Sequence, residues 1–512
     1  MSKVLFLYPN LNSYGLTPIG ISITSALLKK YGHQTDLFDT TFIDCKDFFA
    51  PKTDAVYTKK MEQLMFFKPV DLRKVGVCKE KKDVVEEFRK KVNAFKPDII
   101  AFSFWSCQLT GEEEGMMYER GKKLLEVANI NYETTGIHII AGGIQPSLEP
   151  EKVLDDGVTD IVCIGEGELA YLELAEFLKE KKDIYSIKNL WIKQDNKIYK
   201  NSLRPLIENL DDLPFADFDL FDDKSFYRPY HGKIVRGIDY EFTRGCINQC
   251  YYCVGPQLRK LYDDKKFRRE KSIKRIIEEI SYLKNKYKLD IIRYQDELFL
   301  GMEINKLKQL AKEYRTKVNL PFIIETSVNS LNPDTIECLK TMGCLSVSVG
   351  IEHGNEKFRE QVLNKFYSNS QAIEAFRLLK KNGISVHAYA MLGFPDETRK
   401  LAFDTINLLK YLKVSTYQVS IFQPFYGTEL RKICLKKGLI NENDKMLEFV
   451  SGTILKNTYL SEKEILGLQR TFSMYVYSPK TFWFIIKIAE QNDFVYKILL
   501  RIFQFFIRIS LH

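Results

Sequence analysis

The chain has 512 residues, of which 45% are hydrophobic and 28% are charged, and its formal net charge is +9. This composition is ordinary for globular domains and excludes a low-complexity, collagen-like or disordered chain. The length allows two or three domains, and the excess of Lys is spread along solvated helical faces, which does not indicate nucleic-acid binding. No secretory signal and no paired disulfide spacing is visible, so we expect a reducing, cytoplasmic compartment.

The first two hundred residues alternate short apolar runs with helix-like segments. The runs lie at residues 3–9, 35–39, 98–103, 138–143 and 160–165. This alternation predicts a doubly wound parallel sheet with helices on both faces. Ligands of such sheets bind at the carboxyl ends of the strands. The sequence places the following residues there: Ser103, Gly142, Gly143, Gly165, Glu166 and Gly167. Glycine lets a backbone approach a bulky ligand, but these runs are equally consistent with turns that leave a strand.

A second series of apolar runs begins after an acidic segment, residues 209–217, that is broken by Pro214. The runs lie at residues 240–243, 291–295, 322–325, 346–350, 386–391 and 417–421, each with an amphipathic helix pattern after it. Six such repeats predict a partial β/α barrel with functional groups at the carboxyl ends of its strands. We therefore expect a first domain at residues 1–200, a linker at 201–235, a barrel at 236–440 and a helical region at 441–512.

Polar and glycine residues follow several of the predicted barrel strands. Asp296 and Glu297 end the second strand, where carboxylates either pair with a cationic ligand or cap the next element. Glu352 ends the fourth strand, two residues after Gly350, and a carboxylate suits the two hydroxyls of a ribose. Gly393 follows the fifth strand. These residues are the candidate site of the barrel.

Three cysteines stand within eight residues near the start of the barrel. Cys246, Cys250 and Cys253 have the spacing Cys-x-x-x-Cys-x-x-Cys, with the aromatic Tyr252 just before the last one. Three thiolates can hold three irons of a four-iron cluster, and the fourth iron then stays open to a ligand. A structural zinc site needs four closed ligands, commonly two Cys-x-x-Cys pairs, and that pattern is absent. The loop therefore predicts a 4Fe-4S centre, with zinc as the weaker alternative.

This cysteine spacing resembles that of the radical S-adenosylmethionine (radical SAM) superfamily. The resemblance implies that the three cysteines ligate a 4Fe-4S cluster and that S-adenosylmethionine fills the open iron and is cleaved reductively to a 5'-deoxyadenosyl radical. It implies cofactor contacts from the residues at the strand ends, which are Tyr252, Asp296, Glu297, Gly350, Glu352 and Gly393. The turn after Gly393 departs from the family pattern, because Asp396 stands where a second glycine is usual.

The first domain resembles the cobalamin-binding domain that precedes one class of radical SAM enzymes. The matching stretches are residues 18–20, 141–146, 150–154 and 160–168. The resemblance implies cobalamin contacts from Pro18, Ser103, Gly142, Gly143, Gly165, Glu166 and Gly167. The Asp-x-His-x-x-Gly signature that supplies the lower cobalt ligand in cobalamin mutases is absent, so the resemblance names no lower ligand.

The two resemblances together imply a cobalamin-dependent radical SAM methyltransferase of an anaerobic or microaerobic cytoplasm. Its substrate is small-molecule or lipid-like and not readable from the sequence, and its electrons come from a ferredoxin- or flavodoxin-type protein. The alternatives are a cobalamin-dependent cyclase or rearrangement enzyme, a methylthiotransferase-like enzyme and a non-catalytic iron–sulfur redox sensor. Against the methylthiotransferase, the early cysteine expected after the first strand is missing from residues 9–14.

The last helical segment, residues 495–509, is apolar around most of its circumference. At 100° per residue, Lys497, Arg501, Gln504 and Arg508 fall on one narrow stripe. A helix with these charges is a poor transmembrane span. We expect it to pack on the barrel, to lie in a membrane interface or to form a dimer contact. Peripheral membrane association is therefore an alternative to a purely cytoplasmic location.

Overall fold

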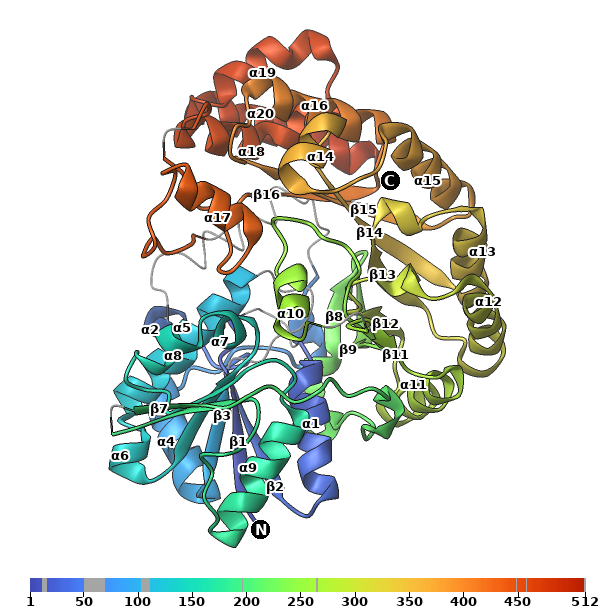
Figure 1. Cartoon of the computed structure of the whole chain (residues 1–512). Coiled ribbons are helices and arrows are strands. Elements are labelled where there is room, and N and C mark those ends of the chain that lie inside the picture. The colour runs from blue at the N-terminus through green and yellow to red at the C-terminus, as the bar shows by residue number, and fades with distance from the viewer. Residues whose placement is uncertain are drawn as a thin grey trace.

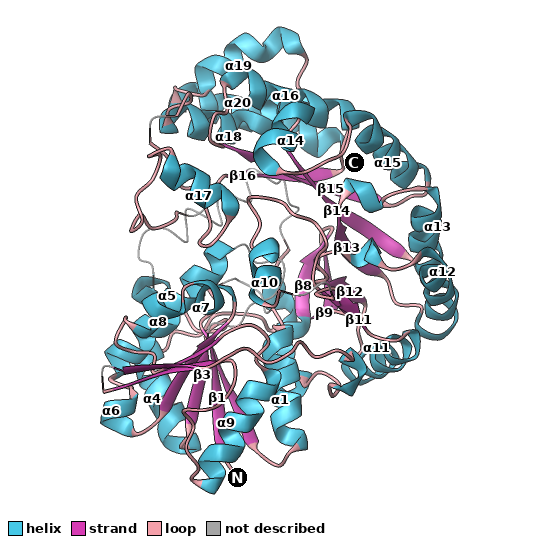
Figure 2. Cartoon of the chain, viewed as in Figure 1, coloured by secondary structure: helices cyan, strands magenta, loops and turns pink. Residues whose placement is uncertain are grey.

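Two seven-stranded sheets organise the chain in the computed structural model (Figure 1). The structure describes residues 1–11, 16–49, 70–102, 111–195, 197–263, 266–447, 449–456 and 458–510. Figure 2 shows the two sheets as separate groups of strands with helices around them. The predicted candidate Ser103 lies outside the described residues.

The first sheet has the strand order β2-β1-β3-β4-β5-β6-β7. Its strands are β1 (Lys3–Tyr8), β2 (Gln34–Asp39), β3 (Ile99–Phe102), β4 (His138–Gly142), β5 (Ile161–Cys163), β6 (Leu190–Gln194) and β7 (Lys197–Lys200). The first five pair in parallel, which confirms the predicted doubly wound sheet, and β6 and β7 add an antiparallel hairpin at one edge. The sequence did not predict the hairpin, because its strands are short and half polar.

Helices cover both faces of the first sheet. They are α1 (Ile19–Lys30), α2 (Lys46–Phe49), α4 (Val84–Phe95), α5 (Gly111–Ala128), α6 (Tyr132–Thr135), α7 (Ile144–Leu148), α8 (Pro150–Leu154) and α9 (Glu168–Glu180). Val4 and Phe6 of β1 pack in the core that contains α1 and α9, whereas Leu5 and Leu7 pack in the core of α4 and α5. Successive side chains of a strand point to opposite faces, so a sheet that is buried on both sides needs the continuous apolar run seen in β1.

The second sheet has the strand order β16-β15-β14-β13-β12-β9-β8. Its strands are β8 (Tyr227–Tyr230), β9 (Lys233–Tyr240), β12 (Ile291–Tyr294), β13 (Phe322–Thr326), β14 (Cys344–Glu352), β15 (Ser385–Leu392) and β16 (Thr416–Ile421). All but β8 run in parallel, and β8 and β16 are the two edges. The predicted six-stranded partial barrel is confirmed. Its first strand, β9, ends where the predicted strand begins, because Gly237 and the charged Arg236 and Asp239 obscure the apolar pattern of β9.

Helices line the outside of the barrel and occupy its loops (Figure 1). The outer helices are α11 (Ile273–Tyr287), α12 (Ile304–Glu313), α13 (Pro333–Met342), α15 (Asn369–Lys381) and α16 (Arg399–Leu412). The loops after the strands carry β10 (Thr243–Arg244), β11 (Arg269–Glu270), α10 (Gly255–Leu261), α14 (Glu356–Leu363) and α17 (Glu429–Lys436). This arrangement puts the loop elements at the carboxyl ends of the strands, where barrels carry their functional groups.

The segment between the two sheets is tied to the first domain by polar contacts. Asp217 accepts a hydrogen bond from the Ser25 hydroxyl at 2.5 Å and lies 2.7 Å from the Lys29 ammonium, both on α1. At the start of the barrel, Asp239 of β9 accepts from the N–H of Thr17 at 3.3 Å. The segment just before α1 is thus hydrogen-bonded to the first parallel strand of the barrel.

Three helices end the chain: α18 (Glu462–Tyr477), α19 (Trp483–Ala489) and α20 (Asp493–Ser510). Leu468 and Phe472 of α18 belong to the same apolar core as β16 and α16, so α18 closes the side of the barrel next to its last strand. In the described part of the chain, no helix combines the length and the apolar character needed to cross a bilayer.

Candidate active site

The three predicted cluster cysteines lie together in the loop between β10 and α10, just beyond the carboxyl end of β9. The N–H of Asn248 donates to Cys246 Sγ at 3.4 Å, and the N–H of Gly255 donates to Cys253 Sγ at 3.5 Å. Burial raises the pKa of Cys246 and raises that of Cys253 to about 12, and the charge of Cys250 raises both further. The three cysteines therefore lie in one short loop and influence one another's charge.

The surroundings of these sulfurs fit an iron–sulfur cluster. Backbone N–H groups that point at thiolates are a usual feature of such sites, and Lys365 adds a positive charge that lowers the pKa of Cys246 and Cys253. No group of three or more His, Cys, Asp and Glu side chains in the described ranges is arranged to hold a single metal ion. A four-iron cluster instead takes its three thiolates on three different irons.

The cysteine loop is held from two sides. The N–H of Tyr251 donates to the carbonyl of Leu363 at the end of α14, at 3.0 Å, and the N–H of Leu430 in the first turn of α17 donates to the Tyr251 carbonyl at 2.9 Å. The amide of Asn364 donates to the Gln249 carbonyl at 2.7 Å. The loop is therefore positioned by helices that follow β14 and β16.

Tyr252 and Glu352, which are far apart in sequence, meet through a third residue that the sequence did not indicate. The Tyr252 hydroxyl donates to Glu352 Oε1 at 3.1 Å, and Lys365 Nζ lies 3.1 Å from the same oxygen and 3.2 Å from the Tyr252 hydroxyl. Burial alone would lower the pKa of Lys365, but the charge of Glu352 raises it above its usual value. A lone lysine in a loop carries no sequence signal for such a role.

The backbone at Gly350 and Glu352 leaves room for the contact between Glu352 and Lys365. A Cβ atom on Gly350 would lie 2.2 Å from Glu352 Oε1 and 2.9 Å from Lys365 Nζ, so only glycine leaves room for the pair. Glu352 itself has φ of +62°, in the left-handed region that side chains rarely adopt, and the strand register shifts between Gly350 and Glu352. Strained residues of this kind concentrate at functional sites.

Asp296 and Glu297 follow β12 and face the start of the cysteine loop. Asp296 Oδ1 accepts from the N–H and hydroxyl of Thr243, each at 2.6 Å, while its buried Oδ2 has no hydrogen-bond partner. Glu297 accepts from the N–H of Gly245 at 3.0 Å. Burial raises the pKa of both carboxyls to about 7. A buried carboxyl oxygen without a partner fits a cationic ligand group, because it would gain a charge-assisted bond there.

The predicted contact at Gly393 is occupied by the protein itself. The N–H groups of Gly393 and Phe394 donate to Glu397 Oε2 at 2.6 and 3.2 Å, and the other oxygen of Glu397 lies 3.2 Å from His353 Nε2. Asp396 has φ of +62° and forms an ion pair with Lys437. Asp tolerates the left-handed conformation better than most residues, which explains how it replaces the glycine usual at this turn.

The first-domain candidates lie at the carboxyl edge of the first sheet, where tyrosines already contact most of them. Pro18 is the N-cap residue of α1, Gly142 ends β4, and Gly143 is the N-cap residue of α7. A Cβ atom on Gly142 or Gly167 would come within 3.0 Å of Tyr171. These glycines therefore serve close packing of a side chain, whether or not a ligand also lies there.

Gly165 makes room for a residue of the other domain. It has φ of +74°, and a Cβ atom there would lie 1.9 Å from the hydroxyl of Tyr262, just after α10. The same hydroxyl accepts a hydrogen bond from the N–H of Glu166 at 2.8 Å. The helix that follows the cysteine loop is thus docked directly on the loop after β5.

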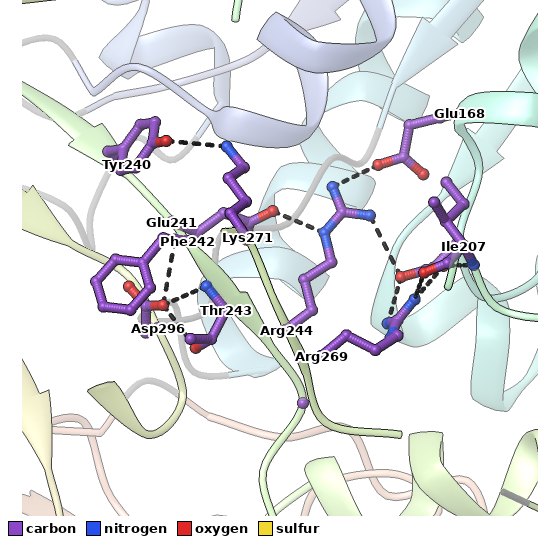
Figure 3. Close-up of polar contacts among 12 residues, drawn as sticks. Glu168, Ile207, Tyr240, Glu241, Phe242, Thr243, Arg244, Arg269, Lys271 and Asp296 are labelled. Carbon is purple, nitrogen blue, oxygen red and sulfur yellow. Dashed lines mark hydrogen bonds and ion pairs between the residues drawn. The ribbon is translucent and has the colours of Figure 1, made fainter. Parts of the chain in front are cut away.

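An ion network extends this contact, and Figure 3 shows Arg244 at its centre with Arg269 and Glu168 nearby. The Arg244 guanidinium lies 2.6 Å from Glu168, 2.8 Å from Glu241 and 3.3 Å from Glu166. Glu166 also lies 2.7 Å from Arg269. Burial alone would raise the pKa of Glu166, but the two guanidinium groups lower it. The carboxylate of Glu166, a predicted cobalamin contact, is thus bonded to two arginines at the start of the barrel.

A second polar cluster, on the inner strands of the barrel, was not predicted. Glu325 accepts from the Tyr389 hydroxyl at 2.8 Å and lies 3.8 Å from Arg293. His387 Nδ1 lies 2.7 Å from the Thr416 hydroxyl, and burial lowers the pKa of His387 to about 4. The alternate residues of β15 pack in the core with the outer helices, so these polar side chains occupy the opposite, inner face. The alternation of polar and apolar residues along β15 was the sequence feature that could have predicted this cluster.

Comparison with known proteins agrees with this geometry. Residues 240–409 match the model of the Radical SAM superfamily. An uncharacterized methyltransferase of Pyrococcus horikoshii is 26% identical over 419 residues, 80% of this chain and 85% of the relative. The cytidylyl-2-hydroxyethylphosphonate methyltransferase of Streptomyces wedmorensis is 21% identical over 517 residues, 91% of this chain and 88% of the relative.

A solved structure shares the fold over both domains. It is the radical S-adenosylmethionine methyltransferase TsrM of Kitasatospora setae, with a TM-score of 0.60, 16% identity and coverage of 86% of this chain and 80% of that one. The coverage of 86% of this chain means that the shared fold includes the doubly wound domain as well as the partial barrel. Residues 240–409 are thus a domain of the radical SAM superfamily, and most of the chain is similar to proteins named as methyltransferases.

Proposed function

We propose that this enzyme transfers a methyl group from S-adenosylmethionine, by way of cobalamin, to an unactivated centre of a small-molecule or lipid-like substrate. The named methyltransferases that match most of both chains support methyl transfer. One structural observation carries the proposal: Arg244, two residues before Cys246, is ion-paired with Glu166 at the carboxyl edge of the first sheet. That contact brings the cysteine loop to the edge where doubly wound sheets bind their ligands.

In this proposal Cys246, Cys250 and Cys253 hold the cluster, and the residues around them hold S-adenosylmethionine. The cofactors supply the difficult chemistry, namely one-electron cleavage of a sulfonium and transfer of a methyl group. The protein supplies position and charge. Buried Asp296 offers a carboxyl oxygen without a partner to an ammonium group. Glu352, held by Tyr252 and Lys365, offers its carboxylate to hydroxyl groups.

The inner cluster of the barrel is suited to orient a polar part of the substrate. Arg293 and Glu325 are partly exposed, with side-chain exposures of 32% and 24%, so they can bind a ligand group. His387 stays neutral near pH 7, because its pKa is about 4. We propose a ferredoxin- or flavodoxin-type reductant, which the net charge of +9 would attract if that protein is acidic.

The test uses the full chain, purified without oxygen, reconstituted with iron and sulfide, and supplied with hydroxocobalamin, dithionite and methyl-labelled S-adenosylmethionine. We expect bound corrinoid that carries the label, together with 5'-deoxyadenosine, and we expect Cys250→Ala to abolish the nucleoside. Bound corrinoid without label would favour a cyclase or another rearrangement. Nucleoside without corrinoid would favour a cobalamin-free enzyme, such as a methylthiotransferase-like one. If neither labelled corrinoid nor 5'-deoxyadenosine is found, the result would favour the non-catalytic iron–sulfur redox sensor.

A further inference from the structure

The two C-terminal helices present a row of large apolar side chains to solvent. On α20, Phe494, Ile498, Ile502 and Phe505 follow at intervals of four, four and three residues, so they form one stripe. Each is exposed, from 44% for Ile498 to 72% for Phe494. The other side of α20 packs on the barrel core through residues that include Leu499 and Phe503. The stripe is therefore the more exposed face of α20.

Helix α19 and the turn before it extend the same kind of surface. Phe482, Phe484 and Ile488 are exposed by 53%, 65% and 53%. We call the seven side chains the apolar face; they are Phe482, Phe484, Ile488, Phe494, Ile498, Ile502 and Phe505. Figure 1 places α19 at the end of the molecule farthest from the first domain. Single exposed apolar residues are normal, but a group of this size marks an interaction surface.

The charges around the apolar face are almost all positive. Residues 480–512 contain five Lys or Arg residues and only two acids, Glu490 and Asp493. Glu490 is buried and accepts bonds from Arg399 at 2.6 Å and Tyr475 at 2.5 Å, while Asp493 pairs with Arg470. The exposed cations are Lys480, Lys487, Lys497 and Arg501. The surface therefore combines exposed aromatic and aliphatic groups with uncompensated positive charge.

We propose that the apolar face docks on an anionic lipid bilayer, with α19 and α20 lying in its interface. Basic amphipathic helices bind membranes in this way, through buried apolar area and attraction to anionic headgroups. Packing of a second copy on the face would bring Lys497 and Arg501 of both copies together, and like charges oppose such a contact. Helix α20 suits this position, because one of its sides packs on the barrel core and the other exposes large apolar side chains.

The apolar part of the proposal is tested by sedimentation of the full-length protein with vesicles of phosphatidylcholine and phosphatidylglycerol. We expect the parent to sediment with them and the double variant Ile498→Asn, Ile502→Asn to bind at least about tenfold more weakly. The matched control is Tyr31→Asn, Val127→Asn, which removes two apolar residues exposed by 53% and 48% on the first domain. The control should bind like the parent.

The charge part is tested with Lys497→Gln, Arg501→Gln. Each cation near an anionic surface contributes about 1 kcal/mol, so binding should fall by about tenfold or more, and vesicles of phosphatidylcholine alone should bind the parent weakly. The control Lys340→Gln, Lys381→Gln removes two exposed cations from the outer barrel helices. Equal thermal midpoints of all variants show that each is folded.

The proposal is overturned if the parent does not bind the mixed vesicles, or if both face variants bind them as the parent does. A second copy as the occupant would appear in sedimentation velocity as a dimer that the Ile498, Ile502 variant dissociates. If an acidic protein were the occupant, the parent would bind that protein but would not sediment with the vesicles. Each of these results contradicts a bilayer as the occupant of the face.

Discussion

The carboxylate of Glu166, in the loop after β5, lies 3.3 Å from the guanidinium of Arg244, two residues before the first cluster cysteine. The side chains are exposed by only 18% and 14%, so the pair is largely shielded from water. Arg269 shares the same carboxylate. The position of the cysteine loop is therefore linked to the first domain by charge as well as by packing.

Glu166→Gln should destabilise the protein markedly. The substitution leaves Arg244 and Arg269 without one of their counter-charges in a partly dehydrated site, at a cost of about 3 kcal/mol. Urea unfolding under anaerobic conditions measures it. The control is Glu173→Gln, which breaks a more exposed pair between α9 and Arg204 in the segment after the first sheet and should cost less than about 1 kcal/mol. Equal losses would show that Glu166 has no special role between the domains.

Cys250→Ala should abolish cluster binding, because three irons cannot be held by two thiolates. Reconstituted protein should lose most of its iron and its visible absorbance. Cys78→Ala removes an exposed cysteine outside the loop and should leave both unchanged. Retention of full iron by Cys250→Ala would contradict the assignment of the three-cysteine site.

The buried carboxyl of Asp296 should make stability depend on pH. Its pKa is raised from 3.8 to about 7 in the folded protein, so the folded state binds the proton more tightly than the unfolded one. The stabilisation is complete below about pH 4 and is lost as pH rises through 7, with a slope of up to about 1.4 kcal/mol per pH unit. Subtracting the unfolding free energies of Asp296→Asn from those of the parent between pH 4 and 8 isolates this slope. A difference that does not change with pH would refute the raised pKa.

Lys365→Ala should weaken binding of S-adenosylmethionine. Without the ammonium 3.1 Å away, the buried Glu352 carboxylate loses the positive partner that holds it in place, so it accepts hydroxyl bonds less well. We expect at least about tenfold weaker binding in equilibrium dialysis, with cluster content measured in parallel. Lys381→Ala, on the outside of the barrel, is the matched control. Unchanged binding would remove Glu352 and Lys365 from the cofactor site.

The sequence predicted the five parallel strands of the first sheet, and five of the six parallel strands of the second, because each is a short apolar run bounded by polar turns. The partners of Glu166 could not be predicted in this way. Arg244 and Arg269 lie about 80 and 100 positions after Glu166 in the sequence. No local sequence pattern predicts a contact over such a separation. Lys365 was missed for the same reason, since one lysine among many in a loop has no distinguishing neighbours.

The pattern also failed where charge interrupts an apolar strand. Lys233 and Arg236 made the sequence of β9 look too polar for a strand. In β15, His387 and Tyr389 were included in an apolar run, although their side chains face the inside of the barrel. Polar residues inside a strand are explained by what lies opposite them in space, and only the assembled sheet supplies that information.

Helix α17 is attached at both ends to parts of the site. Its first turn bonds to Tyr251 in the cysteine loop, and Lys437 at its end pairs with Asp396 in the turn after β15. Loss of iron would loosen the first attachment but not the second. Amide hydrogen exchange of residues 429–437, compared between protein with and without iron, should therefore report cluster occupancy from a helix that contains none of the cluster ligands.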